Sequence, residues 1–74
     1  SESVYVDFSV RDQSALQVQL FDMIGRPVLE KRVDAAPGEY QLQLNVAHLP
    51  SGTYLVRLTR EDGRYDMRKL VIQD

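Results

Sequence analysis

The fold is decided by a stretch of ten residues with the sequence Leu49-Pro50-Ser51-Gly52-Thr53-Tyr54-Leu55-Val56-Arg57-Leu58. Tyr54, Val56 and Leu58 occupy every second position, and this period is typical of a β-strand with one face on a core. Gly52 lies two residues before Tyr54, and Leu49 lies five before it. This is the spacing of a tyrosine corner, in which glycine allows the turn and the hydroxyl bonds to backbone just upstream. The stretch therefore indicates a Greek-key β-sandwich; the alternative is an ordinary loop followed by a strand.

Five further segments have the composition or alternation of β-strands, and they span residues 4–10, 15–21, 27–33, 40–46 and 65–72. Gly25 and Gly63 fall in short loops where a positive φ is expected, and the pair Asp62-Gly63 favours a type I′ hairpin turn. Pro27 cannot donate a ladder hydrogen bond, so its strand is expected to begin at the edge of a sheet or just outside the sheet. No segment has a convincing helical period. We expect one all-β domain over residues 1–74, an Ig-like β-sandwich of about six to seven antiparallel strands of Greek-key type.

The Gly-x-Tyr spacing occurs twice, because Gly38-Glu39-Tyr40 parallels Gly52-Thr53-Tyr54. We interpret the two segments as the same turn-to-strand device and not as a repeat architecture. In a chain without tryptophan, core and corner roles are expected for most of the tyrosines. A sugar-binding face lined by tyrosines is a less favoured alternative.

The last predicted strand changes parity along its length. Tyr65 and Met67 share one parity, whereas Leu70 and Ile72 share the other. A β-bulge at Arg68-Lys69 would restore the inward face; alternatively, the strand is buried on both sides from residue 70 onward. In either case an apolar strand close to the end of the chain can add to a neighbouring sheet edge.

Composition excludes several classes of function. The 9 basic and 11 acidic side chains give a net charge of −2, and their mixed order does not form a nucleic-acid-binding stripe. There is no cysteine, and no spacing of metal ligands or Gly-rich phosphate loop is present. His48 is the only histidine, and we expect it to be a solvated loop residue. We therefore expect no enzyme activity, no catalytic residue, no metal and no cofactor.

Three stretches stand out together: Val18-Gln19-Leu20-Phe21-Asp22-Met23-Ile24-Gly25-Arg26-Pro27-Val28, Leu49-Pro50-Ser51-Gly52-Thr53-Tyr54-Leu55-Val56-Arg57 and Lys69-Leu70-Val71-Ile72-Gln73. In this order they resemble one known family, the C-terminal sorting domain of the type IX (Por) secretion system. The resemblance covers the chain from about residue 4 to the end. The chain departs from the family pattern in one respect, since it has no Asn-Pro segment before the first strand.

The resemblance implies a transport signal. A cargo, often a protease or adhesin, would lie N-terminal to the domain, so residues 1–74 would be a fragment of a longer secreted protein. The protein would cross the periplasm, be recognised by the type IX translocon, and reach the outer membrane, the cell surface or the medium. A sortase-like surface protease would then remove the domain. The alternative function is a structural or adhesive Ig-like module of a cell-surface protein.

The resemblance also assigns residues to roles. The segment read by the translocon falls on the closing motif, Lys69, Leu70, Val71, Ile72 and Gln73. Structural motif positions are Gly25, Leu49, Gly52, Tyr54 and Gly63. We expect Leu70 and Ile72 to pack and Lys69 and Val71 to be more accessible. A thin core and apolar end strands also predict a homodimer formed by strand exchange when the domain is isolated.

Overall fold

A computed structural model describes residues 3–73 and contains six β-strands and no helix in that range. The strands are β1 (Ser3–Val10), β2 (Ser14–Phe21), β3 (Pro27–Ala35), β4 (Gly38–Asn45), β5 (Gly52–Thr59) and β6 (Tyr65–Ile72). Within the described range there is accordingly no helix of the length and apolarity that a membrane crossing requires. The strands match the segments predicted from the sequence, and in β1, β2, β4 and β5 the inward face is formed by apolar side chains at alternate positions.

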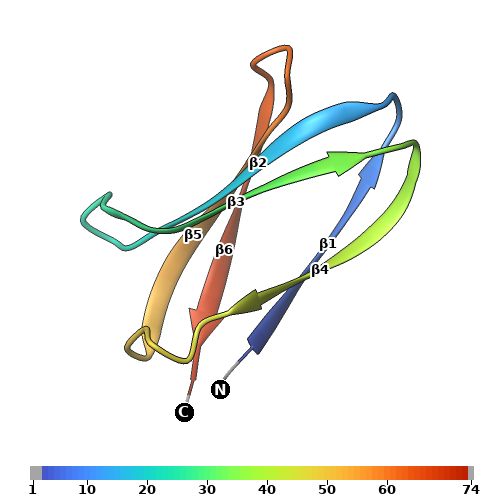
Figure 1. Cartoon of the computed structure of the whole chain (residues 1–74). Helices are drawn as coiled ribbons and strands as arrows, with labels where there is room; N and C mark the ends of the chain where they lie inside the picture. Colours follow the sequence, from blue (N-terminus) through green and yellow to red (C-terminus); the bar gives the residue numbers. More distant parts are fainter. Residues whose placement is uncertain (1–2, 74) are drawn as a thin grey trace.

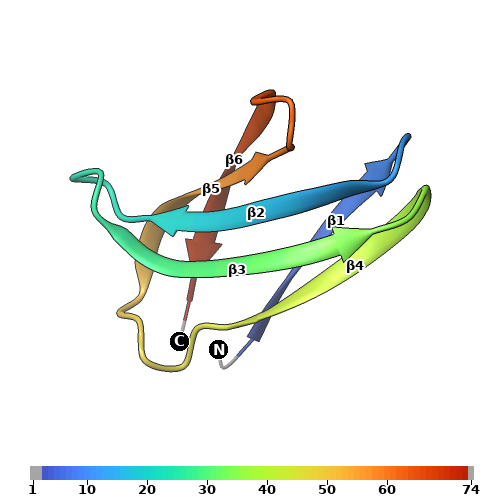
Figure 2. The same ribbon diagram turned by 45° about the horizontal axis from the view of Figure 1, so that its top comes forward.

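The strands form two antiparallel sheets that face each other (Figures 1 and 2). One sheet has two strands in the order β1-β4, and the other has four in the order β3-β2-β5-β6. The hairpins β2–β3 and β5–β6 lie within the larger sheet. β1 and β4 pair with each other although β2 and β3 separate them in the sequence. This arrangement confirms the all-β, Ig-like sandwich. Figure 1 also shows that the beginning of β1 and the end of β6 lie at the same end of the molecule.

The core lies between the two sheets and is made by alternate residues of both. Its largest fully buried side chains are Leu20, Leu44, Ile72, Val18, Val46 and Val56. Among the described residues, no polar or charged residue is buried with them. Pro27 begins β3, which is an edge strand, so the missing amide of Pro27 leaves no central ladder position unpaired. The core is therefore purely apolar, and the burial of hydrocarbon holds the sheets together.

The β2–β3 loop has three residues and is fixed by its first side chain. The Gly25 amide donates to the Asp22 carbonyl at 3.0 Å, and the Asp22 amide donates to the Arg26 carbonyl at 3.0 Å. Gly25 has a φ of +90°, which fits a type I turn followed by a left-handed residue. The Asp22 carboxylate accepts the amides of Ile24 and Arg26 at 3.0 and 2.9 Å and pairs with the Arg26 guanidinium. These contacts, led by the Arg26 amide, outweigh desolvation and lower the pKa of Asp22.

The β5–β6 loop repeats this backbone conformation, and the predicted type I′ turn is wrong. The Gly63 amide donates to the Arg60 carbonyl at 3.0 Å, and the Arg60 amide donates to the Arg64 carbonyl at 2.8 Å. Gly63 has a φ of +88°, but no described residue other than glycine has a positive φ. A type I′ turn would require a positive φ at Asp62 as well. Asp62 instead has negative φ and accepts the Arg64 amide at 2.9 Å, which supports the three-residue loop.

Both Gly-x-Tyr segments form the same hydrogen bond. The Tyr54 hydroxyl donates to the Pro50 carbonyl at 2.7 Å, and the Tyr40 hydroxyl donates to the Ala36 carbonyl at 2.6 Å. In each case the acceptor lies four residues before the tyrosine, and Leu49 packs against the core beside the second corner. The predicted device is therefore present twice, once at the start of β4 and once at the start of β5.

The expectation that most tyrosines have core or corner roles is only half right. Tyr54 is buried and Tyr40 stacks on Phe8 with ring centroids 5.5 Å apart, but Tyr5 and Tyr65 are 57% and 58% exposed. Tyr5 belongs to β1 and Tyr65 to β6, so the exposed rings lie on different sheets. They do not form a common platform for a sugar.

The parity change in β6 has neither of the predicted causes. β6 pairs with β5 without a register shift from Thr59–Tyr65 to Gly52–Ile72, so there is no bulge. Val71 is 48% exposed, so the end of the strand is not buried on both sides. The register places Asp66 and Arg68 on the inner side instead. Both are exposed, and Arg68 reaches the backbone carbonyl of Asp7 in β1.

Candidate functional site: the terminal edge strand

The closing motif lies on β6, at the edge of the larger sheet. Among the described residues, β6 pairs only with β5, so its other edge has free backbone donors and acceptors. Ile72 is 2% exposed, and Leu70 packs against the core. Lys69 and Val71 are exposed and project from the opposite face of the sheet. This confirms the expected division between packing and accessible positions, and Gln73 follows directly after the strand.

The register joins the closing motif to the tyrosine corner. Gly52 lies opposite Ile72, and Tyr54 lies opposite Leu70. The two segments that the sequence singled out independently are therefore neighbours, and the corner holds the inner side of the terminal strand. Gly25 is remote from this cluster, in the β2–β3 loop. Gly63 lies at the far end of β6, in the β5–β6 loop.

Two arginine contacts near this strand were not predicted. The Arg57 guanidinium lies 4.9 Å from the Phe21 ring centroid and 5.9 Å from that of Tyr65. Its Nη2 and Nε also donate to Gln19 Oε1 at 2.7 and 3.3 Å. The other contact joins Arg68 to the Asp7 carbonyl. Both depend on which residues face each other across strands, and spacing along the chain gave no signal for either.

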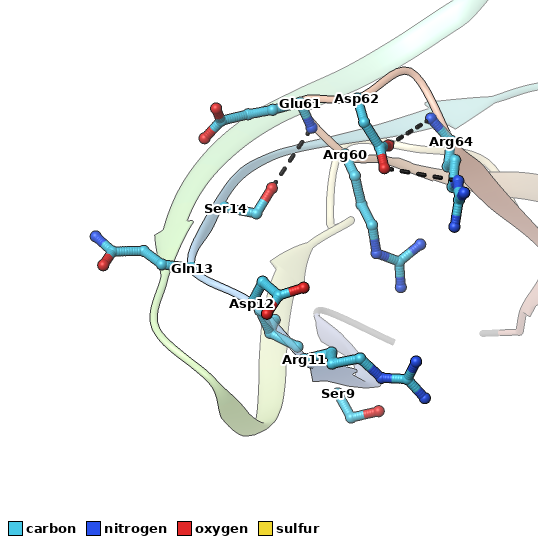
Figure 3. Close-up of a pocket in the computed structure, with 10 residues that line it drawn as sticks. Ser9, Arg11, Asp12, Gln13, Ser14, Arg60, Glu61, Asp62 and Arg64 are labelled. Carbon is cyan, nitrogen blue, oxygen red and sulfur yellow. Dashed lines mark hydrogen bonds and ion pairs between the residues drawn. The ribbon is translucent and has the colours of Figure 1, made fainter.

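A polar hollow lies between the β1–β2 turn and the β5–β6 loop (Figure 3). Its volume is about 660 Å³, and two of its acidic side chains, those of Glu61 and Asp62, accept backbone hydrogen bonds. Glu61 accepts the Ala15 amide at 2.5 Å, and the Glu61 amide donates to Ser14 Oγ at 3.4 Å. Asp62 accepts the Arg64 amide. The hollow is thus a hydrogen-bonded junction that fastens the hairpin to the start of β2.

Potential metal ligands are scattered over the chain. Residues 3–73 contain no group of three His, Cys, Asp or Glu side chains that could hold a metal ion. His48 is exposed in the loop between β4 and β5, as expected. The chemistry available at β6 is that of recognition: free backbone groups, apolar side chains and a cation.

Comparison with known proteins identified one family. A family model described as "Secretion system C-terminal sorting domain" matches residues 1–73. No curated protein and no solved structure matches the chain.

Proposed function

The chain belongs to the family of secretion system C-terminal sorting domains, and from this premise we propose that β6 is the part of the signal read by the type IX translocon. As a sorting signal of this kind, the domain directs export toward the outer membrane, the cell surface or the medium. In our proposal the cargo lies N-terminal to the domain and passes through the periplasm. A sortase-like surface protease then removes the domain.

The proposal depends on one observation: Lys69, Leu70, Val71 and Ile72 lie on β6, an edge strand that pairs with β5 alone among the described residues. Backbone groups along such an edge can pair with an added strand whatever the cargo is, while side chains at alternate positions supply specificity. Lys69 and Val71 are the side chains that this strand presents outward. Leu70, Ile72 and the tyrosine corner support the strand from the inside.

The test is export of a reporter fused N-terminally to residues 1–74, in a host with type IX machinery. Lys69→Ala with Val71→Ala removes the accessible side chains and leaves the core residues in place. We expect surface export to fall about tenfold or more, as for the loss of binding anchors. Replacing residues 69–72 with alanine should abolish export, but this change also removes core contacts of Ile72.

A matched control lies on the other edge of the same sheet. Lys31→Ala with Arg32→Ala alters two exposed residues of β3 and should leave export unchanged. Normal export of the Lys69/Val71 variant would contradict the assignment of β6. Retention of the unaltered fusion in the periplasm would favour the second candidate function, a structural Ig-like module.

A further inference from the structure

The first half of β6 exposes apolar side chains that the closing motif does not include. Tyr65 is 58% exposed and Met67 is 46% exposed, and both project from the same face as Lys69 and Val71. Single exposed apolar residues are common on protein surfaces. Here four outward positions in succession carry Tyr65, Met67, Lys69 and Val71, so the apolar surface extends along the whole strand.

Neighbouring strands extend this surface across the sheet. The register places Thr59, Arg57, Leu55 and Thr53 of β5 beside those four residues. Phe21 of β2 lies beside Leu55. We call the residues Phe21, Arg57, Tyr65, Met67, Lys69 and Val71 the outer platform.

One part of the outer platform, the stack of Phe21, Arg57 and Tyr65, is held in place before any partner binds. Arg57 lies between the rings of Phe21 and Tyr65 and is also hydrogen bonded to Gln19, so contacts across β2, β5 and β6 fix its guanidinium. A surface that is already ordered loses less side-chain entropy on binding. The stack therefore favours a binding role more than flexible surface side chains would.

The outer platform is also positively charged. Its cations are Arg57 and Lys69, and the outward positions of β5 and β6 carry no carboxylate. The outward carboxylates of the larger sheet, Glu30 and Asp34, lie on β3 at its opposite edge. The outer face of the β1–β4 sheet carries Asp7 and Glu39 on paired strands. A partner of the outer platform should consequently be acidic.

We propose that the outer platform selects an extended, acidic protein segment that adds to the free edge of β6. An added strand would lie about 5 Å from β6 and run alongside about 20 Å of it. Its alternate side chains would then lie beside Tyr65, Met67, Lys69 and Val71. The segment would carry a carboxylate beside Lys69 and apolar side chains beside the other three. This rests on the proposed function, and it makes Tyr65 and Met67 specificity residues of the sorting signal.

The first experiment uses the reporter fusion described above. Tyr65→Ser with Met67→Ser should reduce surface export about tenfold or more. The matched control is Tyr5→Ser, since Tyr5 has nearly the same exposure, 57% against 58%, on the outer face of the other sheet. It should export normally, and thermal unfolding of each variant checks that the fold is kept. Equal export of the Tyr65/Met67 variant and the control would overturn this proposal while leaving the sorting function intact. Failure of the unaltered fusion would remove the sorting function itself.

The second experiment identifies the occupant. A photocrosslinking amino acid at position 65 of the fusion should capture a component of the export machinery, and the same group at position 5 should not. Lys69→Glu should weaken the cross-link, because it places a carboxylate opposite the acidic segment. Cross-links only between two copies of the domain, only to lipopolysaccharide sugar, or unaffected by Lys69→Glu would each overturn the proposal.

Discussion

At the scale of single residues, two tyrosine hydroxyls perform the same task in different surroundings. Tyr54 is 6% exposed and donates to Pro50 at 2.7 Å. Tyr40 donates to Ala36 at 2.6 Å, but this bond lies in an exposed site. A carbonyl that loses its donor in the exposed site can bond to water, whereas a more buried carbonyl does so less easily. The two bonds should therefore differ in their effect on stability although their geometry is alike.

We predict that Tyr54→Phe lowers the free energy of unfolding by about 1 kcal/mol, the usual net contribution of one hydrogen bond. Tyr40→Phe should lower it by less. Urea denaturation of both variants, with the midpoint and slope compared, measures the difference. Equal losses in the two variants would show that burial does not distinguish the corners.

Sequence reasoning found residues whose role is local and missed those whose role depends on register. Tyr54 was predicted because Gly52 and Leu49 stand at fixed distances from it in the chain. Arg57 between Phe21 and Tyr65 was not predicted, because those partners come from two other strands. A shift of register by one residue would turn these side chains to opposite faces, and composition alone does not fix that register.

At the scale of elements, the β5–β6 loop shows that a dipeptide can predict a hairpin loop without predicting its turn type. Asp62-Gly63 was predicted correctly as a hairpin loop but wrongly as a type I′ turn. The same sequence also suits a three-residue loop, in which only Gly63 needs a positive φ. Strand register decides between the two loops. Here the hydrogen bond from the Arg60 amide to the Arg64 carbonyl identifies the longer one.

We predict that Gly63→Ala lowers the free energy of unfolding by about 1–2 kcal/mol, the cost of a Cβ in left-handed conformation. An added Cβ would meet no atom within 4 Å, so the effect comes from backbone strain and not from a clash. Gly63→Asn should cost less, because asparagine tolerates this conformation better. Thermal unfolding of the two variants provides the comparison, and an equal loss in both would argue against a conformational cause.

Alternation along β6 predicts burial correctly in one part of the strand and wrongly in another. Alternation predicted the burial of Ile72 correctly, because the core covers that half of the strand. It failed at residues 66–68, because the inward positions Asp66 and Arg68 are polar and exposed. Period two reports burial only where a facing layer exists, and the extent of that layer depends on the whole fold.

At the scale of the whole molecule, the sandwich is small and its edges are open. Among the described residues, β3 and β6 end the larger sheet, and β1 and β4 form a sheet with only two strands. A chain of 74 residues buries only about 60% of its unfolded surface. Exchange of an edge strand between copies needs little new contact area, because it reuses the contacts of the monomer.

We predict that the isolated domain forms a homodimer by strand exchange. Analytical ultracentrifugation at protein concentrations across the micromolar range should show a monomer–dimer equilibrium. A monomer mass at every concentration would contradict the prediction.

The neighbouring positions of the start of β1 and the end of β6 (Figure 1) have a consequence for the geometry of delivery. In the proposed function, the cargo is attached at the end of the molecule where β6, the strand recognised by the translocon, also ends. A bulky cargo joined by a short linker would then sterically block access of the translocon to β6. The efficiency of export should therefore depend on the length of the linker between the cargo and the domain, whatever the sequence of that linker.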